Sequence, residues 1–581
     1  MLKTLLKEVR EFKKASIATP IFMLLEVLME TMIPYLMASI IDQGVNAGNL
    51  GHIYRIGALM IVAAAIGLFA GMAGGRYGAK ASAGLARNLR KSMFDHIQTF
   101  SFANIDKFST AGLVTRLTTD VTNIQNAYQM MLRMMMRAPA TMICALVMAF
   151  TINVRLASIY LIAVLFLGTI LFFIIRHATS YFRMAFPKYD ELNASVQENV
   201  SAIRVVKAYV REEHETSKFQ KASENIYRIF VKAERNVIFN SPLMQFTVYT
   251  CIILISWIGA KMIVSNSLTT GELMSLLTYC MNILSSLMML SMVFVMLSMS
   301  TASAERICEV LNEQSDLANP PHPLTEVKDG SIAFHHVDFS YKKESQEPVL
   351  HDISLEIHSG ETIGIIGATG SSKSSLVSLI SRLYDATSGE VLVGGRNVKE
   401  YDMEALRNQV AVVLQNNVLF SGSIYDNLRW GNLNASDEEC QEACRLACAD
   451  DFIRSFPNGY NTRIEQSGNN VSGGQKQRLC IARALLKKPR ILILDDSTSA
   501  VDTATDAKIR RAFREEIPNT TKLIIAQRIS SVQDADRILV LDEGRINGFG
   551  THEELLKTNA IYREVYESQT KGGGDFDERS E

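Results

Sequence analysis

Long apolar runs dominate the first three hundred residues of the chain. Six of these runs are long enough to cross a bilayer, which requires ~20 residues each. They are centred near Met29, Ala65, Leu146, Leu165, Leu254 and Met288. Short links follow the first, third and fifth runs, whereas the links after the second and fourth are long, charged and helix-like. This pattern predicts six membrane helices with long extensions outside the bilayer.

Basic residues are distributed unevenly among these links. The segments 76–125 and 176–235 are rich in Lys and Arg, whereas 42–53 contains neither. Because positively charged loops stay on the cytosolic side, we expect the long links in the cytosol. Residues 1–14 alternate apolar and basic positions with no cleavage site after them, which indicates an interfacial helix and not a signal peptide. Both termini are therefore expected in the cytosol.

The pattern changes after residue 313. Residues 314–323 contain three prolines and are typical of a linker. Short β-branched runs then alternate with helical patterns from residue 332 onward, which favours an α/β domain with a largely parallel sheet. We therefore predict a helical membrane domain over residues 1–313, a linker over 314–330, an α/β domain over 331–570 and a disordered tail over 571–581.

Composition agrees with a membrane domain joined to a soluble one. Hydrophobic residues make up 48% of the chain and the net charge is −1, which disfavours a nucleic-acid-binding protein. Cys440, Cys444 and Cys448 recur every four residues of a helical pattern. No fourth ligand lies nearby in the sequence, so buried packing is favoured over a metal site.

The first apolar run carries two acidic residues. Glu26 and Glu30 are four residues apart and therefore share one helix face. Charges at membrane depth are costly and normally face a cavity or a partner. These carboxylates either contact cationic cargo in a transport cavity or form a proton-sensitive element. Alternatively they pair with Arg133 or Arg137, or Glu26 lies near the headgroups.

A glycine-rich and serine-rich loop gives the sharpest local signal. It runs from Gly367 to Ser375, directly after the apolar strand pattern 362–366 and before a helical pattern. This is the context of a loop that cradles nucleotide phosphates with backbone N–H groups at a helix N-terminus. Lys373 would contact the phosphates and Ser374 would hold Mg²⁺. The residues expected at the phosphates are Gly367, Gly370, Ser371, Ser372, Lys373, Ser374 and Ser375.

Ser372 departs from the usual form of this loop, which has glycine immediately before the lysine. Serine adopts the loop conformation only with a negative φ or at a cost in backbone strain. The sequence alone leaves this choice open.

A second motif makes the resemblance specific. The run 470–478, Asn-Val-Ser-Gly-Gly-Gln-Lys-Gln-Arg, is similar to the signature sequence of the ATP-binding cassette (ABC) family, and the strand ending in Asp495 follows it in the family's order. The six preceding runs resemble the exporter branch. The resemblance covers the whole chain and implies an all-α six-helix membrane domain with long cytosolic extensions, fused to an α/β P-loop ATPase that uses ATP and Mg²⁺.

Further residues are assigned through the resemblance. Tyr341 matches the aromatic residue on which adenine stacks, unless it is a core tyrosine at a strand end. Gln415 matches the glutamine that senses magnesium. Segments 112–119 and 208–213 resemble the two cytosolic coupling helices. Asp495 matches a residue of the Mg²⁺ site. The signature comprises Val471, Ser472, Gly473, Gly474 and Gln475, and the loop between the two nucleotide sites contains Ser499 and Asp502.

Two positions differ from ATP-hydrolysing relatives. Asp496 stands where they usually carry Glu, and Gln527 stands where they usually carry His. The carboxylate of Asp is one methylene shorter and falls ~1 Å short of the attacking water, a displacement that costs on the order of a hundredfold. Gln retains a donor but lacks the proton chemistry of His. The alternative is that Asp496 acts on a shifted water.

Cassettes of this family work as head-to-tail pairs, in which each ATP lies between one P-loop and the other chain's signature. The resemblance therefore implies half of a heterodimeric exporter of amphipathic compounds in a bacterial plasma membrane. Its own site would be degenerate, whereas its signature would complete the site of a homologous partner half. The alternatives are a homodimer with slow hydrolysis by Asp496, or an ATP-gated channel or regulatory subunit that does not pump.

Overall fold

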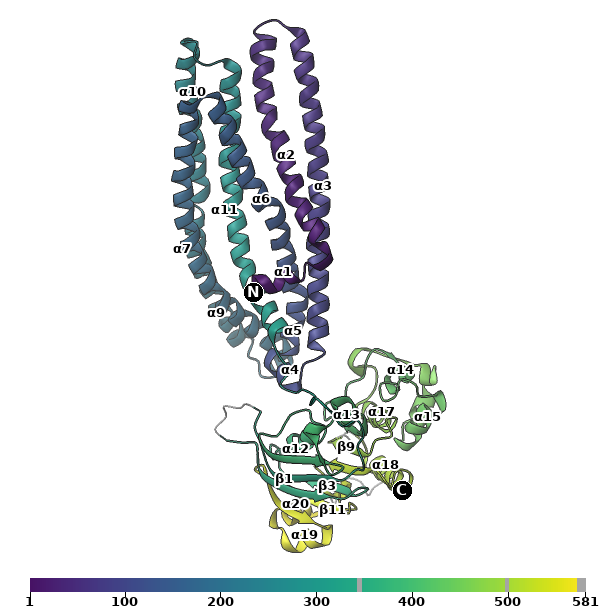
Figure 1. The fold of residues 1–581 in the computed structure, drawn as a ribbon. Helices are drawn as coiled ribbons and strands as arrows, with labels where there is room; N and C mark the ends of the chain where they lie inside the picture. The colour runs from purple at the N-terminus through teal and green to yellow at the C-terminus, as the bar shows by residue number, and fades with distance from the viewer. Residues whose placement is uncertain (342–346, 497–500, 572–581) are drawn as a thin grey trace. The chain divides into compact units, whose positions relative to one another are not determined.

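The computed structural model describes residues 1–341, 347–496 and 501–571 (Figure 1). It contains two compact units. The helical unit comprises Met1–Thr99 and Phe108–Glu313, and the α/β unit comprises Phe100–Lys107 and Gln314–Glu581.

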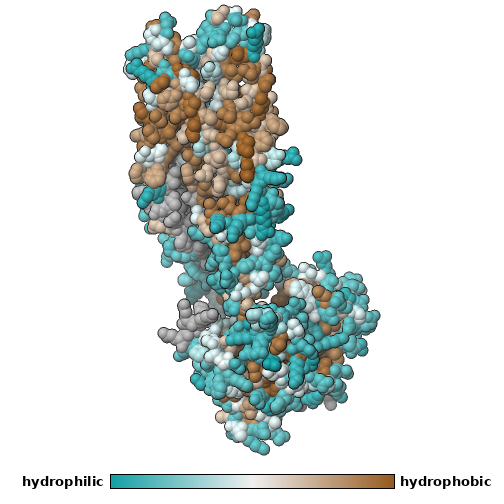
Figure 2. Space-filling model, in the orientation of Figure 1, coloured by the Kyte–Doolittle hydropathy of each residue, from teal (hydrophilic) through white to brown (hydrophobic). Residues whose placement is uncertain are grey.

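Long helices form the helical unit, and six of those described are long and apolar enough to cross a membrane. This confirms the six predicted runs. Figure 2 shows apolar side chains over the middle of these helices and hydrophilic residues toward their ends. The corresponding helices are α2 (Lys13–Ser39), α3 (Leu50–Ile97), α6 (Val121–Ile152), α7 (Val154–Ser201), α10 (Asn240–Val264) and α11 (Thr270–Asn312).

The short links are built from local helix caps. The Asn49 side chain accepts a hydrogen bond from His52 N at the start of α3, and Asn153 does the same for Arg155 N and Leu156 N at the start of α7. Such caps satisfy backbone N–H groups that have no partner within the helix. Each chain reversal is therefore encoded by the polar residue that precedes the next apolar run.

A hydrogen-bonded contact joins the link after α2 to the start of α11. Asp42 lies in the π-helix η2 (Ile40–Val45), and its carboxylate accepts from Thr269 Oγ1 at 2.5 Å and from Gly271 N at 2.9 Å. A Cβ atom at Gly271 would lie 2.5 Å from the carbonyl oxygen of Ala38. Glycine is therefore required for this close approach.

The N-terminal segment is tied to α3. It contains α1 (Leu2–Lys7) and the short helix η1 (Arg10–Phe12). Asn88 Nδ2 donates to the carbonyl oxygen of Glu8 at 2.9 Å, and Ser92 Oγ donates to the Glu8 carboxylate at 2.7 Å. Arg87 pairs with Glu11. The segment thus has polar partners on α3 in addition to its apolar face.

A buried carboxylate joins α11 to the region where α6 begins. Asp120 is the last residue of the π-helix η3 (Arg116–Asp120) and is fully buried. It accepts from Ser303 Oγ at 2.8 Å and from Arg306 Nε at 2.7 Å. Because an unpaired buried charge is strongly unfavourable, this pair fixes the register of the two elements.

The shorter helices lie mostly in the long links between the apolar helices and in the α/β unit. In the first half of the chain they are α4 (Phe102–Phe108), α5 (Thr110–Thr115), α8 (Ile203–Ala208) and the longer α9 (Glu212–Val237). In the α/β unit they are α12 (Lys373–Ile380), α13 (Met403–Gln409), α14 (Ile424–Leu428), α15 (Asp437–Leu446), α16 (Asp450–Ser455), α17 (Gly473–Leu485), α18 (Thr503–Glu516), α19 (His552–Thr558) and α20 (Ala560–Lys571).

Two larger sheets and one pair of short strands form the α/β unit. The first sheet has the antiparallel order β2-β1-β4-β5, from β2 (Leu350–Ile357), β1 (Ile332–Phe339), β4 (Ser388–Val393) and β5 (Arg396–Asn397). The second has the order β12-β11-β3-β10-β9-β6, from β12 (Arg545–Gly550), β11 (Arg537–Asp542), β3 (Thr362–Ile366), β10 (Thr521–Ile525), β9 (Ile491–Asp495) and β6 (Val410–Val413). The pair is β7 (Gly422–Ser423) with β8 (Arg463–Ile464).

The second sheet positions the candidate site. Its strands β11, β3, β10, β9 and β6 are parallel, and only the edge strand β12 runs antiparallel. β9 is buried throughout, as the near-continuous apolar run of a central parallel strand predicts. Loops that follow neighbouring parallel strands meet at one edge of a sheet. The segments after β3, β9 and β10 are therefore brought together.

Replacing the cation that pairs with Asp120 tests the importance of that contact. We expect Arg306→Gln to lower the free energy of unfolding of the helical unit by about 3 kcal/mol, because it leaves a buried carboxylate without its counter-charge. Thermal unfolding of the purified protein in detergent measures the loss. Arg228→Gln is the matched control, since Arg228 and Glu224 form an exposed pair on one helix and such pairs contribute only about 0.5 kcal/mol. Equal shifts in the two variants would contradict the assignment.

Candidate functional site

The loop between β3 and α12 has the shape of a phosphate cradle. It begins at Gly367 and ends at Ser372, the residue that precedes α12. Gly370 has φ +87°, and a Cβ atom placed there would meet open space. Gly370 therefore borders open space, and the loop leads directly into the N–H groups of the first turn of α12.

Ser372 adopts a left-handed conformation with φ +70° and ψ 25°. Of the two alternatives left by the sequence, the structure shows the strained one. This conformation is natural for glycine but costs about 1 kcal/mol or more for a residue with a Cβ atom. The strain lies at the residue before Lys373, where it affects the start of α12.

Lys373 is folded back over the loop. Its Nζ donates to the carbonyl oxygens of Gly367 and Ala368 at 2.8 Å each and to Ser371 Oγ at 3.2 Å. Burial lowers the pKa of Lys373, while the nearby Asp495 and Asp496 carboxylates oppose that shift. The ammonium group of Lys373 donates to neutral carbonyl oxygens. An anionic ligand would bind this ammonium group more strongly than the carbonyls do and could replace them.

Asp495 ends β9 close to the start of α12. Burial raises the pKa of this carboxyl, whereas a hydrogen bond with Ser374 and the charge of Lys373 favour its ionised form. A carboxylate beside a serine hydroxyl at the end of a phosphate cradle is a donor set that suits Mg²⁺, which prefers oxygen ligands. The structure thus brings together Ser374 and Asp495, the two residues that the sequence predicts as metal contacts.

Asp496 and Gln527 contact each other directly. Gln527 Nε2 donates to Asp496 Oδ2 at 2.9 Å. Asp496 has φ +47°, and its backbone N–H donates to the carbonyl oxygen of Ile525 at 3.1 Å. Both side chains lie at the ends of adjacent parallel strands, since β9 pairs with β10. The two positions that depart from the hydrolytic pattern thus form one hydrogen-bonded pair.

Tyr341 lies over the phosphate loop from the end of the first sheet. Its hydroxyl is 2.8 Å from Ser375 Oγ, and its ring packs edge-on against Tyr384 with the ring centroids 5.1 Å apart. Tyr341 is 49% exposed, so part of its surface remains accessible to a ligand. This exposure is unlike a core tyrosine and suits a flat ligand.

Gln415 follows β6 in an exposed loop. Its carbonyl oxygen accepts from Asn417 Nδ2 at 3.5 Å. β6 is the strand next to β9, so Gln415 comes from the same edge of the sheet as Asp495.

The signature residues start α17 in another part of the α/β unit. Ser472 caps this helix: its Oγ accepts from Gln475 N at 3.3 Å, and Gln475 Oε1 accepts from Ser472 N at 2.9 Å. Gly473 and Gly474 form the first turn between them, while Val471 packs against the core of this region. The turn therefore presents backbone N–H groups and the positive end of a 13-residue helix to the surface.

Asp502 begins α18. Its carboxylate accepts from Thr505 N at 2.9 Å, and this hydrogen bond lowers the pKa of Asp502. Ser499, which the sequence analysis placed in the same loop, lies outside the described residues.

Glu26 and Glu30 both pair with one arginine. Arg137 Nη1 donates to Glu26 Oε1 at 2.9 Å, and Arg137 Nη2 donates to Glu30 Oε2 at 2.8 Å. This is one of the pairings left open by the sequence. The Arg137 guanidinium thus links α2 to α6, at a point where both helices are within candidate membrane spans.

A short segment of the first long link belongs to the α/β unit, which the sequence did not predict. This segment is Phe100–Lys107, whereas 112–119, the predicted first coupling helix, lies in the helical unit. Asp106 Oδ2 accepts from the hydroxyl of Tyr384 at 2.8 Å, and Phe102 packs edge-on against the same ring. The apolar residue Phe102 in a charged link was the available signal.

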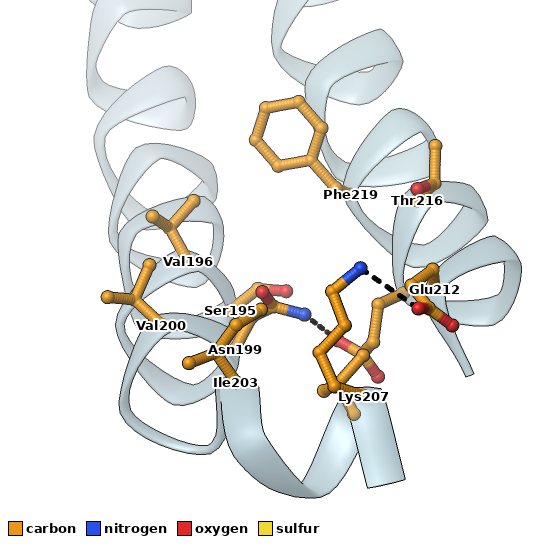
Figure 3. Close-up of a pocket in the computed structure, with 11 residues that line it drawn as sticks. Ser195, Val196, Asn199, Val200, Ile203, Lys207, Glu212, Thr216 and Phe219 are labelled. Carbon is orange, nitrogen blue, oxygen red and sulfur yellow. Dashed lines mark hydrogen bonds and ion pairs between the residues drawn. The ribbon is translucent and has the colours of Figure 1, made fainter. Parts of the chain in front are cut away.

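The second expected coupling segment, 208–213, runs from the end of α8 into the start of α9, within the helical unit. A cavity of about 360 Å³ lies between α7, α8 and α9 (Figure 3). Its apolar lining includes Val196, Val200 and Phe219. Lys207 closes one side through a 2.9 Å ion pair with Glu212.

Cys440 and Cys444 are fully buried in the main hydrophobic core of the α/β unit. Burial raises the pKa of Cys444 to about 12, so its thiol stays protonated at neutral pH. Both side chains act as apolar filling between α15 and its neighbours.

Comparisons with known proteins cover almost the full chain. The family model of the ABC transporter transmembrane region matches residues 17–299, and the model of the ABC transporter matches residues 350–499. The uncharacterized ABC transporter ATP-binding protein YfiB of Bacillus subtilis is 39% identical over 549 residues, which covers 94% of this chain and 95% of that protein.

Two further relatives extend the comparison. An ATP-dependent lipid A-core flippase of Desulfotalea psychrophila is 33% identical over 84% of this chain and 84% of its own length. The solved structure of a bacterial Atm1-family ABC exporter with ATP bound has the same fold, with a TM-score of 0.83 and 24% identity over 96% of this chain and 99% of that chain. A phosphate loop, a helix-capping signature and six long apolar helices occur here in one chain that matches such relatives from end to end, and the chain therefore belongs to the ABC transporter family.

Proposed function

We propose that this chain is one half of a heterodimeric, ATP-driven exporter in a bacterial plasma membrane, with both termini in the cytosol. Its own P-loop holds ATP but hydrolyses it weakly. Its signature segment completes the competent ATP site of a homologous partner half. The cargo is a small amphipathic compound, such as a drug or a lipid, moved out of the cytosol.

The hydrogen bond between Gln527 and Asp496 carries this proposal. Hydrolysis requires an acceptor that orients the attacking water. One oxygen of the short Asp496 carboxylate accepts instead from the Gln527 amide, at 2.9 Å. An amide has no proton to exchange near neutral pH, so Gln527 cannot act as histidine does. The site therefore lacks both the reach and the proton chemistry for fast turnover.

The remaining residues of this site suit nucleotide binding. Lys373 and the first turn of α12 would hold the phosphates, Ser374 and Asp495 would hold Mg²⁺ with Gln415 nearby, and the partly exposed Tyr341 would stack on adenine. Bound Mg·ATP supplies the phosphoanhydride whose cleavage resets the exporter. The contrast between an intact binding set and an altered hydrolytic pair supports a site that binds better than it hydrolyses.

The signature segment supports the other half of the proposal. Its capped first turn offers N–H groups and a positive helix end, which favour an anionic phosphate brought by a second cassette. Asp502, at the start of α18, would lie in the loop between the two nucleotide sites.

The lipid A-core flippase among the relatives supports an amphipathic cargo. The carboxyl groups of Glu26 and Glu30 share the single Arg137 guanidinium, so two acidic side chains face one basic side chain within the candidate spans. Such a group would favour cargo with a positive charge.

The first test is ATP turnover by this chain purified alone in lipid, with bound ATP determined on the same sample. We expect bound ATP with turnover near background, and a large rise when a homologous half that carries Glu and His at the two positions is added. Robust turnover that Asp496→Asn abolishes would instead show a homodimer. ATP-dependent conductance without vectorial transport would show a channel.

Restoring the hydrolytic pair should restore activity. In the chain alone, we expect Asp496→Glu with Gln527→His to raise ATP turnover about a hundredfold, because the longer carboxylate recovers the ~1 Å of reach. Steady-state phosphate release measures this rate. The same double variant carrying Lys373→Ala is the control and should return to background. An unchanged rate in the double variant would contradict the explanation based on Asp496 and Gln527.

The strain at Ser372 has a measurable consequence. We expect Ser372→Gly to stabilise the α/β unit by up to about 1 kcal/mol, because glycine adopts φ +70° without strain. Thermal unfolding in detergent measures the shift. Ser371→Gly is the matched control and should destabilise, since it removes a hydroxyl that accepts from Lys373. Destabilisation by both variants would contradict the assignment of strain to Ser372.

A further inference from the structure

The helix α20 holds the loop that carries Gln527. Gln569 Nε2 donates to the carbonyl oxygen of Gln527 at 2.8 Å, and Gln569 Oε1 accepts from Ile529 N at 2.8 Å. One side-chain amide therefore uses both its donor and its acceptor on the backbone of a three-residue segment. The pairing also fixes the orientation of the amide, because the carbonyl needs a donor and the N–H needs an acceptor.

The position of Gln569 is set by the packing of α20. Tyr562 is fully buried, and its hydroxyl lies 2.6 Å from His552 Nδ1. The Asn559 side chain accepts from Tyr562 N at 2.9 Å, at the start of the helix. Val565 and Tyr566 pack against the main core of the α/β unit. Gln569 is thus presented from a helix anchored along its length.

The clamped segment leads directly to the altered hydrolytic pair. It leaves β10 after Ile525 and continues into the short helix η7 (Ile529–Ser531), whose first residue is 2% exposed. Between these anchors the Gln527 side chain reaches Asp496. The two hydrogen bonds from Gln569 restrain the backbone on both sides of Arg528, and so restrain the direction in which the Gln527 side chain points.

We propose that Gln569 is a positioning residue that sets the place of Gln527 in the ATP site of this chain, so that α20 controls how tightly the site holds ATP. Lys373 and Asp496 are close enough for the carboxylate charge to raise the pKa of the lysine. A terminal phosphate bound beside Lys373 would therefore lie near the Asp496–Gln527 pair. The inference rests on the part of the proposed function that places ATP at this P-loop. It does not depend on the heterodimer or on weak hydrolysis.

The surroundings of the clamp leave room for the loop to move when it is released. A surface cavity of about 610 Å³ adjoins the segment and is lined by Gln527, Ile529, Gln533, Tyr566 and Gln569, among others. Steric packing therefore does not replace the two hydrogen bonds. Loss of the amide should free Gln527 and weaken ATP retention.

The test uses the full chain in lipid nanodiscs and measures the Kd for Mg·ATP. We expect Gln569→Met, which keeps the length of the side chain but removes both hydrogen bonds, to raise the Kd about tenfold. Gln533→Met is the matched control, because Gln533 lines the same cavity and is exposed. It should leave the Kd unchanged. Equal effects of the two substitutions would overturn the proposal.

A conservative variant separates positioning from general stability. Gln569→Glu keeps the acceptor for Ile529 N, but its carboxylate repels the carbonyl oxygen of Gln527 at pH 7.5. When protonated, the carboxylic acid supplies a donor again. The facing carbonyl oxygen raises the pKa of this carboxyl above its usual value of about 4.3. We therefore expect the ratio of the variant Kd to the wild-type Kd to fall as the pH is lowered from 7.5 to 5. A ratio independent of pH would contradict the positioning role.

A double-mutant cycle shows whether Gln569 acts through Gln527. In a Gln527→Ala background, we expect Gln569→Met to have no further effect on the Kd, since the side chain that it positions is absent. Additive effects would overturn the proposal and leave the P-loop assignment intact. If the wild-type chain binds no Mg·ATP, both the inference and the nucleotide part of the proposed function fail.

Discussion

The parallel pairing of β10 with β3 on one side and with β9 on the other is the constraint on which the candidate site depends. It runs in register from Thr521 beside Ile491 to Ile525 beside Asp495. Because all three strands run the same way, the segments that follow them leave the sheet at one edge. A phosphate loop, two acidic residues and Gln527 meet there although about 160 residues separate the first from the last. The sheet interior is apolar, so the chemistry is confined to that edge.

The same sheet separates two tasks within one unit. Its edge carries the phosphate-loop residues, Asp495, Asp496 and Gln527, whereas the capped start of α17 is built separately, by the reciprocal hydrogen bonds of Ser472 and Gln475. Changes at Ser372, Asp496 and Gln527 therefore leave the geometry of Ser472 and Gln475 intact. Substitutions at one of these two places therefore need not alter the hydrogen bonds that build the other.

Much of this arrangement was accessible from the sequence. The six apolar runs, the change of pattern after residue 313 and the phosphate loop each depend on local periodicity or on a fixed spacing of residue types, and such signals survive without tertiary information. The conformation of Ser372 was left open because φ depends on how the loop closes on α12. The pairing of Glu26 and Glu30 with Arg137 and not Arg133 depends on the rotation of α6 against α2. The clamp by Gln569 joins residues far apart in the chain, which no local pattern reveals. For the placement of Phe100–Lys107, the apolar Phe102 within a charged link was a local signal, but it did not identify Tyr384 as the partner.

The placement of Phe100–Lys107 makes the α/β unit discontinuous in sequence. Phe102 and Asp106 are synthesised nearly 280 residues before Tyr384, the side chain that both contact. During translation, Phe102 and Asp106 therefore remain without their contacts to Tyr384 until the remaining membrane helices and the start of the α/β domain have been synthesised. A cassette produced alone from residue 314 onward would expose one face of the Tyr384 ring to water and lack the carboxylate that accepts from its hydroxyl. The boundary between the two units is therefore a property of the folded protein and not of any single cut in the chain.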